Sequence, residues 1–541
     1  MDKEKKSNRN IKQKLFFLLS NNWPYLLGLF IVFFFFAFNV TGLDLAYFPG
    51  DLGDGRFNTY ILEHAHKFLT LQESSLWEAP FMYPEPHVIT YSDNLVGSAP
   101  FYSVWRMFTD RETSFQLWFI TMYFLNFTFS YLFLNSTFKN KYAAVLGAMI
   151  FTISIALQSQ MTHAQTFPRF PIPIAFWMAM LFMKDLKPHY FFLTLLAVVY
   201  QFYCGIYLGF FLIAPISILL LAILVVKRKE LINKVKTLKW NLLILTSLII
   251  NTVVLLLLML PYMERSKTAK VNYYWDVIDS VPTIRSYFSS QQGSLFWDFL
   301  SNTSKDYPAF WDHQIFTGII AMTAMLVFIL LGVKSLFIKN IFNKLNLSKE
   351  QGILLISCVG TFVFYTRFQG YSMYKILYDL PGFNSMRSLT RIINIELLFY
   401  GIALTLITVI LFKYIKKKQW IVFMTLLSLV TLDNYFKPMS SYKMDKKVSQ
   451  ARVSKLTQQM KHIPEGSLVS YEFKGVIDSE AYHQIDGMLA AQSYNLKCIN
   501  AYSADIPEGF YHYFVSPSAE SRQIWFDKKQ LQADTVYVVT N

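Results

Sequence analysis

The stretch YFFLTLLAVVYQFYCGIYLGFFLIAPISILLLAILVV, residues 190–226, carries no charged side chain. An α-helix needs about 20 apolar residues to cross a hydrocarbon core of about 30 Å. The stretch is therefore too long for one crossing, and we predict two helices that meet at a turn near Cys204 and Gly205. A chain with such a segment exposes apolar surface to lipid, which predicts a membrane protein.

The composition of the whole chain supports this class. The 541 residues are 54% hydrophobic and only 16% charged, whereas soluble globular chains carry about 25% charged residues. This excludes a soluble enzyme, a disordered chain and a disulfide scaffold. Cys204, Cys358 and Cys498 have neither metal-ligand nor redox spacing. The first apolar run, from Trp23 to Gly42, is too long for the core of a cleavable signal peptide, so we expect it to remain as a span.

Apolar segments of similar length recur along residues 23–433. We predict there a mainly α-helical, polytopic membrane bundle of about eleven transmembrane helices. The tail, residues 434–541, mixes polar segments with two β-like runs, 467–473 and 535–540, which predict a small α/β domain. The predicted spans are 23–43, 115–135, 142–161, 168–183, 189–205, 207–226, 240–262, 314–333, 351–366, 393–412 and 419–433.

The placement of lysine and arginine predicts the orientation of the bundle. The net charge is +15, and basic residues gather in the N-terminal segment 1–22 and in every second loop. Cytoplasmic loops are enriched in these residues, so the charge marks topology, and we expect no nucleic-acid partner. An odd number of crossings then puts the N-terminus inside and the tail outside. The long outward loops are 44–112, 263–313 and 367–392.

Two aspartates follow the first span closely, in the stretch Gly50-Asp51-Leu52-Gly53-Asp54-Gly55-Arg56. Carboxylates near the bilayer edge are partly desolvated, which raises their pKa and strengthens their attraction for cations. Asp51 and Asp54 are therefore candidates for a general base or for oxygen ligands of Mg²⁺ or Mn²⁺. The alternative is a capped turn, with Asp54 as the N-cap of the next helix.

The residues from Arg56 through Leu69 predict a helix. Apolar residues recur at helical spacing on one face, and the other face carries acidic, basic and aromatic groups. We predict an amphipathic helix that lies on the outer membrane surface and either anchors there or contacts substrate. The polar-face candidates are Arg56, Tyr60, Glu63, His64 and Lys67.

Four further candidate binding residues lie in the next outward segments. Glu85 and Asp93 belong to a proline-rich stretch that cannot form a continuous helix. His163 and Gln165 occupy a short hairpin near membrane depth, where polar groups are costly and often functional. The alternatives are solvated loop residues for the first pair and an interfacial snorkelling cluster for the second.

Two arginines, Arg387 and Arg391, lead into a late span from the outer side. Lysine and arginine are enriched in cytoplasmic loops, so arginines on the outer side suggest a specific role. The planar guanidinium group matches phosphate oxygens, and a phosphate on a lipid carrier would lie at this depth. The alternative is contact with the headgroups of ordinary anionic lipids.

The order of these motifs resembles the C-superfamily of integral membrane glycosyltransferases, and within it a group of bacterial membrane proteins. That group carries a Gly-Asp-x-x-Asp-x-Arg stretch just past the first span, with a helix behind it and a C-terminal outer domain. The likeness covers most of the chain in layout. The matching segments are Gly50 to Arg56, Glu63-His64, Tyr91-Ser92-Asp93, His163-Ala164-Gln165, Leu380-Pro381-Gly382-Phe383 with Arg387, Asp486 to Ala491 and Ala501-Tyr502-Ser503.

The resemblance implies transfer of a sugar from a polyprenyl-phosphate donor, usually with inversion, to a glycan, lipid or protein acceptor. Asp51 or Asp54 becomes the candidate base or metal ligand. Many members have an Asp-Glu pair where this chain has Asp-x-x-Asp, so the role of each acid stays open. The implied location is the bacterial cytoplasmic (inner) membrane, with chemistry at its outer face.

Two readings from other classes remain: a lipid-linked sugar transporter or flippase, and a non-catalytic membrane assembly protein. Transporters place ionisable groups near the bilayer midplane, often in internal repeats. Here the spans are nearly free of charge, except for Arg169 and Glu396 near outer ends, and no repeat is visible. The ionisable groups gather at one surface, which favours surface chemistry.

Overall fold

The computed structural model describes residues 22–268, 273–337, 348–415, 417–438, 442–475, 478–532 and 535–541. Within them the chain is mainly helical, and six helices are long and apolar enough to cross a membrane. These are Asn22–Thr41, Arg111–Phe138, Ala164–Asp185, Ile206–Val226, Leu238–Ser266 and Leu389–Tyr414. The basic segment predicted at the N-terminus lies outside the described residues, apart from Asn22.

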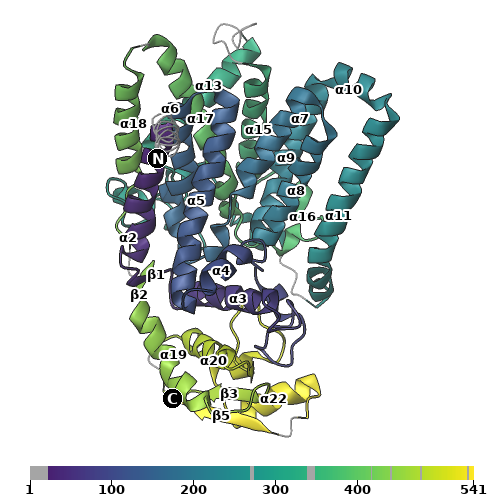
Figure 1. Cartoon of the computed structure of the whole chain (residues 1–541), viewed down its shortest axis with the longest axis vertical. Coiled ribbons are helices and arrows are strands. Elements are labelled where there is room, and N and C mark those ends of the chain that lie inside the picture. The colour runs from purple at the N-terminus through teal and green to yellow at the C-terminus, as the bar shows by residue number, and fades with distance from the viewer. Residues whose placement is uncertain are drawn as a thin grey trace, which may run out of the picture.

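Each predicted apolar span contains a helix, and the long helices form a bundle (Figure 1). The predicted break at residue 204 is confirmed, because α8 ends at Cys204 and α9 begins at Ile206. The first span ends in η1 (Val32–Ala37) and α2 (Phe38–Thr41). The others hold α5 (Arg111–Phe138), α6 (Lys141–Ile153), α7 (Pro171–Asp185), α8 (Pro188–Cys204), α9 (Ile206–Val226), α11 (Leu238–Ser266), α13 (Ile319–Phe337), α15 (Lys349–Tyr365), α17 (Ile393–Tyr414) and α18 (Gln419–Asp433).

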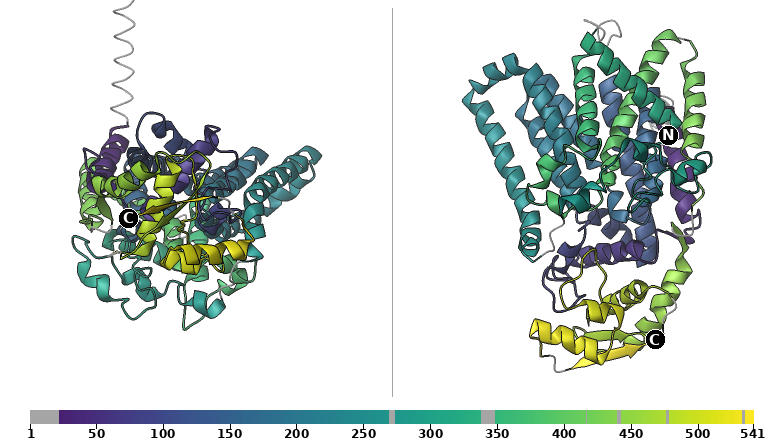
Figure 2. Two further views of the ribbon diagram at one scale, coloured as in Figure 1. Left: turned by 90° about the horizontal axis from the view of Figure 1, so that it is seen from below. Right: turned by 180° about the vertical axis from the view of Figure 1, so that it is seen from behind.

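Helices α6 and α17 pack closely together, because two glycines let their backbones touch. A Cβ atom on Gly147 would lie 2.4 Å from the carbonyl oxygen of Gly401, and one on Gly401 would lie 2.5 Å from that of Gly147. Small residues at such crossings are typical of helices that pack in membranes. By contrast, α11 stands at the side of the bundle and exposes most of its leucines (Figures 1 and 2), as expected of a helix that faces lipid.

The tail lies beyond one end of the bundle (Figure 2). Its first strand, β2 (Lys443–Asp445), pairs antiparallel with β1 (Tyr47–Pro49) of the loop after the first span. The runs predicted as strands are β3 (Leu468–Glu472) and β5 (Val536–Thr540), which are the central strand and one edge strand of a parallel three-stranded sheet of order β4-β3-β5. The remaining elements are α19 (Lys446–Met460), α20 (Glu480–Gln492), β4 (Lys497–Cys498), α21 (Tyr511–Val515) and α22 (Ala519–Lys529).

The predicted surface helix is α3 (Asp54–Leu69), and the prediction that it lies on the membrane surface is wrong. Residues 55–67 of α3 are all buried. The helix lies across the end of the bundle, between α4 (Ala99–Arg106) and α5 on one side and α20 on the other (Figure 1). Its polar face meets the tail and α4 rather than water.

Shorter elements complete the two ends of the bundle. The basic helix α10 (Arg228–Val235) lies at the end of the bundle opposite to α3 (Figure 1). Short helices also occur between the long ones and at their ends, which are η2 (Val88–Tyr91), η3 (Ile155–Gln160), η4 (Ala164–Thr166), α12 (Tyr274–Ile278), η5 (Ile284–Phe288), η6 (Asp298–Asn302), α16 (Lys375–Tyr378), η7 (Phe383–Ser385) and η8 (Leu389–Ile392).

Candidate functional site

The two aspartates of the first loop lie at the start of α3. Gly50 has φ +104° and its missing Cβ would lie 3.2 Å from the Cα of Gly55, so only glycine makes this turn without strain. The helix N-cap is Gly53, which makes no side-chain cap, so the alternative with Asp54 as N-cap is wrong. Asp51 instead closes the turn, because its Oδ1 accepts the backbone N–H of Gly55 at 3.0 Å.

Asp54 is hydrogen-bonded through both carboxylate oxygens. Oδ2 lies 2.7 Å from Nδ1 of His163, and Oδ1 accepts the hydroxyl of Tyr502 at 2.6 Å. The Asp54 and His163 side chains are 27% and 25% exposed, so solvent or a substrate reaches them. The structure therefore joins the first loop, the hairpin after α6 and the tail at one carboxylate–histidine pair.

The two carboxyl groups differ in pKa. Burial raises the pKa of Asp51, and the neighbouring charge of Asp54 raises it further, which outweighs the Gly55 hydrogen bond. Burial acts in the same direction on Asp54, but the hydrogen bonds from His163 and Tyr502 and the charge of Arg391 overcome it and lower its pKa below the usual value. Asp54 is therefore held ionised, in position to orient the imidazole of His163.

The two late arginines lie on the same side as the tail loop that carries Tyr502. The Arg391 guanidinium carbon lies 5.4 Å from the ring centroid of Tyr207, and its buried Nε has no hydrogen-bond partner among the described residues. Arg387 donates from Nη2 to the carbonyl oxygen of Ala504 at 2.8 Å. Its backbone N–H donates to the hydroxyl of Tyr207 at 3.0 Å.

Asp93 and Gln165 hold the backbone segments around this site in place. Asp93 is buried and accepts the first N–H of α9, from Ile206, at 2.6 Å. Burial raises its pKa to about 6, although Arg391 and His163 act in the opposite direction. Gln165 accepts from Nδ2 of Asn58 at 3.1 Å. Both residues fix the position of the hairpin relative to α3 and α9 rather than presenting free polar groups.

Five of the predicted binding residues are buried or bonded to other parts of the protein, so they are not free to bind a substrate beside Asp51 and Asp54. Arg56 is 1% exposed and forms an ion pair with Asp486 of α20. Glu63 is 5% exposed and bonds Tyr102 and Arg106. Buried charges need such partners, so these residues join α3 to its neighbours. The other three are also engaged or buried: Tyr60 at 1% exposed, His64 bonded to the carbonyl of Leu76, and Glu85 paired with Lys529.

The donor set fits a protein-held metal poorly. Within the described residues, no group of three or more His, Cys, Asp or Glu side chains is arranged to hold a metal ion. Both oxygens of Asp54 already accept hydrogen bonds. Mg²⁺ at phosphate sites is often held by one or two carboxylates and the substrate, so Asp51 is the residue left for that role. We derive no step through a metal ion.

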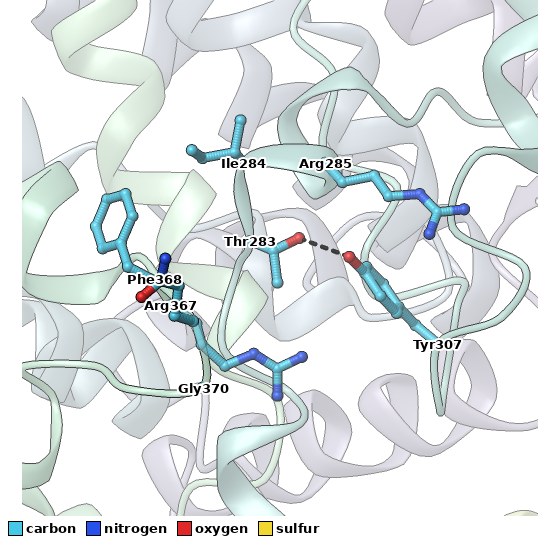
Figure 3. Close-up of a pocket in the computed structure, with 8 residues that line it drawn as sticks. Thr283, Ile284, Arg285, Tyr307, Arg367, Phe368 and Gly370 are labelled. Carbon is cyan, nitrogen blue, oxygen red and sulfur yellow. Dashed lines mark hydrogen bonds between the residues drawn. The ribbon is translucent and has the colours of Figure 1, made fainter.

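A pocket of about 540 Å³ lies elsewhere, between the loops 263–313 and 367–392 (Figure 3). Its walls include Arg285, Tyr307 and Arg367, and the hydroxyls of Thr283 and Tyr307 lie 3.1 Å apart. Arg285 is paired with Asp306, and Arg367 with Asp279. None of the predicted site residues lines this pocket.

Two contributors to the site were missed from the sequence as site residues. Tyr502 lies 448 positions from Asp54, and its segment was noted only as part of a resemblance. Asn58 follows Asp54 by one helical turn and donates to its backbone oxygen at 2.7 Å, so its position on the same helix face was a usable signal. Comparison of the chain with protein-family models and with curated proteins finds no match in either.

Proposed function

We propose that this chain is a membrane glycosyltransferase that moves a sugar from a polyprenyl-phosphate donor to an acceptor at the outer face of the membrane. The observation that carries the proposal is the partly exposed Asp54–His163 pair beside a guanidinium group, that of Arg391. A base and a cation of this kind match the two needs of the reaction. The acceptor hydroxyl must lose a proton, and the phosphate leaving group must be stabilised.

His163 is the proposed base. An ionised carboxylate only accepts hydrogen bonds, so the Asp54 contact assigns the proton to Nδ1 of His163 and leaves the Nε2 lone pair free for the reaction. The acceptor hydroxyl gives its proton to Nε2 as its oxygen bonds to the anomeric carbon. Asp54 keeps the ring oriented and stabilises the imidazolium that forms. This assigns Asp54 to orientation, while Asp51 keeps the alternative role of direct base.

Arg391 is the proposed group for the leaving phosphate. As the bond between the anomeric carbon and the phosphate oxygen breaks, the electron pair stays on that oxygen and its negative charge grows. The guanidinium of Arg391 already acts on Asp54 and Asp93 by charge, yet no hydrogen bond engages it within the described part of the chain. A preorganised donor aimed at developing charge lowers the barrier. Arg387, in the extended segment just before η8, supports the same phosphate.

We also propose the orientation predicted from the charges, with about eleven crossings in residues 23–433. Six helices meet the length and apolarity of a span on their own, and the shorter apolar helices pack among them. Basic α10 and the Asp54 site lie at opposite ends of the bundle (Figure 1), which supports a cytoplasmic α10 and an outward site. Residues 434–541 would then form an extracytoplasmic α/β domain of a bacterial cytoplasmic membrane protein.

One observation favours a flippase as the second candidate. Arg169 and Glu396 are both 0% exposed, and the guanidinium nitrogens of Arg169 have no hydrogen-bond partner among the described residues. Ionisable groups within spans often mark a transport path. A flippase would move the lipid-linked sugar across vesicle membranes without cleaving the sugar–phosphate bond, which separates the two functions.

The test uses membranes that contain the full chain, incubated with a panel of radiolabelled polyprenyl-phosphate sugars and cell-envelope acceptors. We expect label to move to an acceptor with the wild type and to fall at least a hundredfold with His163→Gln. His189→Gln is the matched control, because His189 is exposed at the start of α8. An EDTA arm shows whether Asp51 and the donor phosphate recruit Mg²⁺ or Mn²⁺. Equal transfer by wild type and His163→Gln would refute the mechanism.

A further inference from the structure

We propose that Tyr502, in the tail, is a positioning residue of the site, and that the loop 501–505 completes it. The inference rests on the proposed function, because it concerns the same Asp54–His163 pair. It adds that the last hundred or so residues are part of the catalytic unit rather than an appended domain.

The contact geometry fixes the Asp54 carboxylate on both sides. Tyr502 donates to Oδ1 at 2.6 Å while His163 lies 2.7 Å from Oδ2. A carboxylate held by one donor rotates about its χ2 axis, since that torsion is broad. Two donors on opposite oxygens remove this freedom. The Tyr502 ring also packs edge-on against Phe57 of α3, with centroids 5.3 Å apart, so the hydroxyl is held relative to the helix that carries Asp54.

Three separate parts of the fold anchor the loop that delivers Tyr502. The Gln484 side chain of α20 accepts the N–H of Ala501 at 3.1 Å. Arg387 donates to the carbonyl of Ala504 at 2.8 Å, and Arg265, at the end of α11, donates to Asp505 at 2.6 Å. The Arg387 backbone N–H and the Arg391 guanidinium both contact Tyr207, so the same loop touches the proposed phosphate side and the proposed base side of the site.

The Tyr502 hydroxyl stays protonated and remains a hydrogen-bond donor near neutral pH. Burial, and then the charge of Asp54, raise the pKa of Tyr502, so it stays protonated near neutral pH. The groups that act electrostatically on this cluster are Asp51, Asp93, His163, Arg391 and Tyr482. Tyr502 is the member that donates a hydrogen bond to Asp54 Oδ1, and its loss would make the carboxylate more basic toward His163.

The test is Tyr502→Phe in the full chain, which keeps the ring against Phe57 and removes only the hydroxyl. We expect the acid limb of the transfer rate to move to higher pH by about one unit. At neutral pH kcat falls about tenfold, while the KM for the lipid donor stays unchanged. Tyr511→Phe is the matched control, because Tyr511 is 65% exposed on α21.

A second readout needs no transfer activity. Diethylpyrocarbonate reacts with the neutral form of an imidazole and not with the protonated form. The pH midpoint of His163 modification, followed by peptide mass spectrometry, therefore reports the protonation of this ring. We expect Tyr502→Phe to raise this midpoint by about one unit, as for the acid limb of the rate, with the thermal unfolding temperature close to that of the control. A raised midpoint in a protein that transfers no sugar would support Tyr502 and refute the proposed function. Normal transfer with neither shift would overturn the role of Tyr502 alone.

Discussion

Replacing Asp54 with asparagine removes one of two oxygen acceptors from a group that accepts two hydrogen bonds. An amide has a single oxygen, so its NH2 group must face either Tyr502 or His163. Facing His163, the NH2 donates to Nδ1, which moves the ring proton to Nε2. The nitrogen proposed to take the acceptor proton is then blocked. Facing Tyr502, the amide keeps the tautomer but loses the charge that stabilises the imidazolium.

The expected loss of activity follows from the roles removed. General-base catalysis contributes about 10²–10⁴-fold to a rate, and a wrong tautomer loses most of it. The fold is expected to survive. The Asn58 contact to residue 54 uses the backbone oxygen, and a charge at a helix N-terminus contributes only about 0.3–1 kcal/mol. We therefore expect transfer to fall by about three orders of magnitude with little change in thermal stability.

The assay measures initial rates of label transfer in membranes at equal amounts of folded protein, with Asp44→Asn as the control. Asp44 lies in the same loop, but it is exposed and caps only the N–H of Ala46. Asp51→Asn is measured in parallel, because its loss reports the alternative base. A rate for Asp54→Asn within threefold of the wild type, with the Asp44→Asn rate unchanged, would refute the assignment of Asp54 to the reaction.

Three further outcomes are expected. Arg391→Gln lowers kcat about a hundredfold and Arg391→Lys restores little of it, because lysine cannot reproduce a forked guanidinium; full activity of either variant would remove the phosphate role. Asp486→Asn removes the negative charge that pairs with the buried guanidinium of Arg56 and with Arg452, and it costs about 3–5 kcal/mol of unfolding free energy. Thermal unfolding in detergent measures this loss, and an unchanged melting temperature would contradict it. Burial raises the pKa of Asp93 to about 6 in the folded protein, so the folded state binds a proton more readily than the unfolded chain. As the pH rises from about 4 to 6, the stability of the wild type relative to Asp93→Asn therefore falls by up to about 3 kcal/mol. A pH-independent difference in unfolding temperature between these two proteins would contradict the shift.

The sequence by itself determined the helices and the two longest strands of the tail. Lengths of uncharged apolar chain and the glycine at position 205 are local properties, and no distant partner is needed to read them. For the same reason the strands at 467–473 and 535–540 were predictable from alternating β-branched and aromatic residues, and β3 and β5 are there. Candidate residues such as Asp54 and His163 could also be predicted, because polar residues next to long apolar segments are easily identified in the sequence.

Only the tertiary structure decided which of these groups meet. The hydrophobic period of α3 showed two faces but not that the polar face would meet Asp486, Arg106 and other protein groups instead of water. The His163 and Tyr502 contacts of Asp54 span 109 and 448 positions. Such pairings depend on how the whole chain packs, so no local pattern encodes them. That packing gave Asp54 two hydrogen bonds and Arg56 a buried partner, and so separated a reactive candidate from a structural one two residues away.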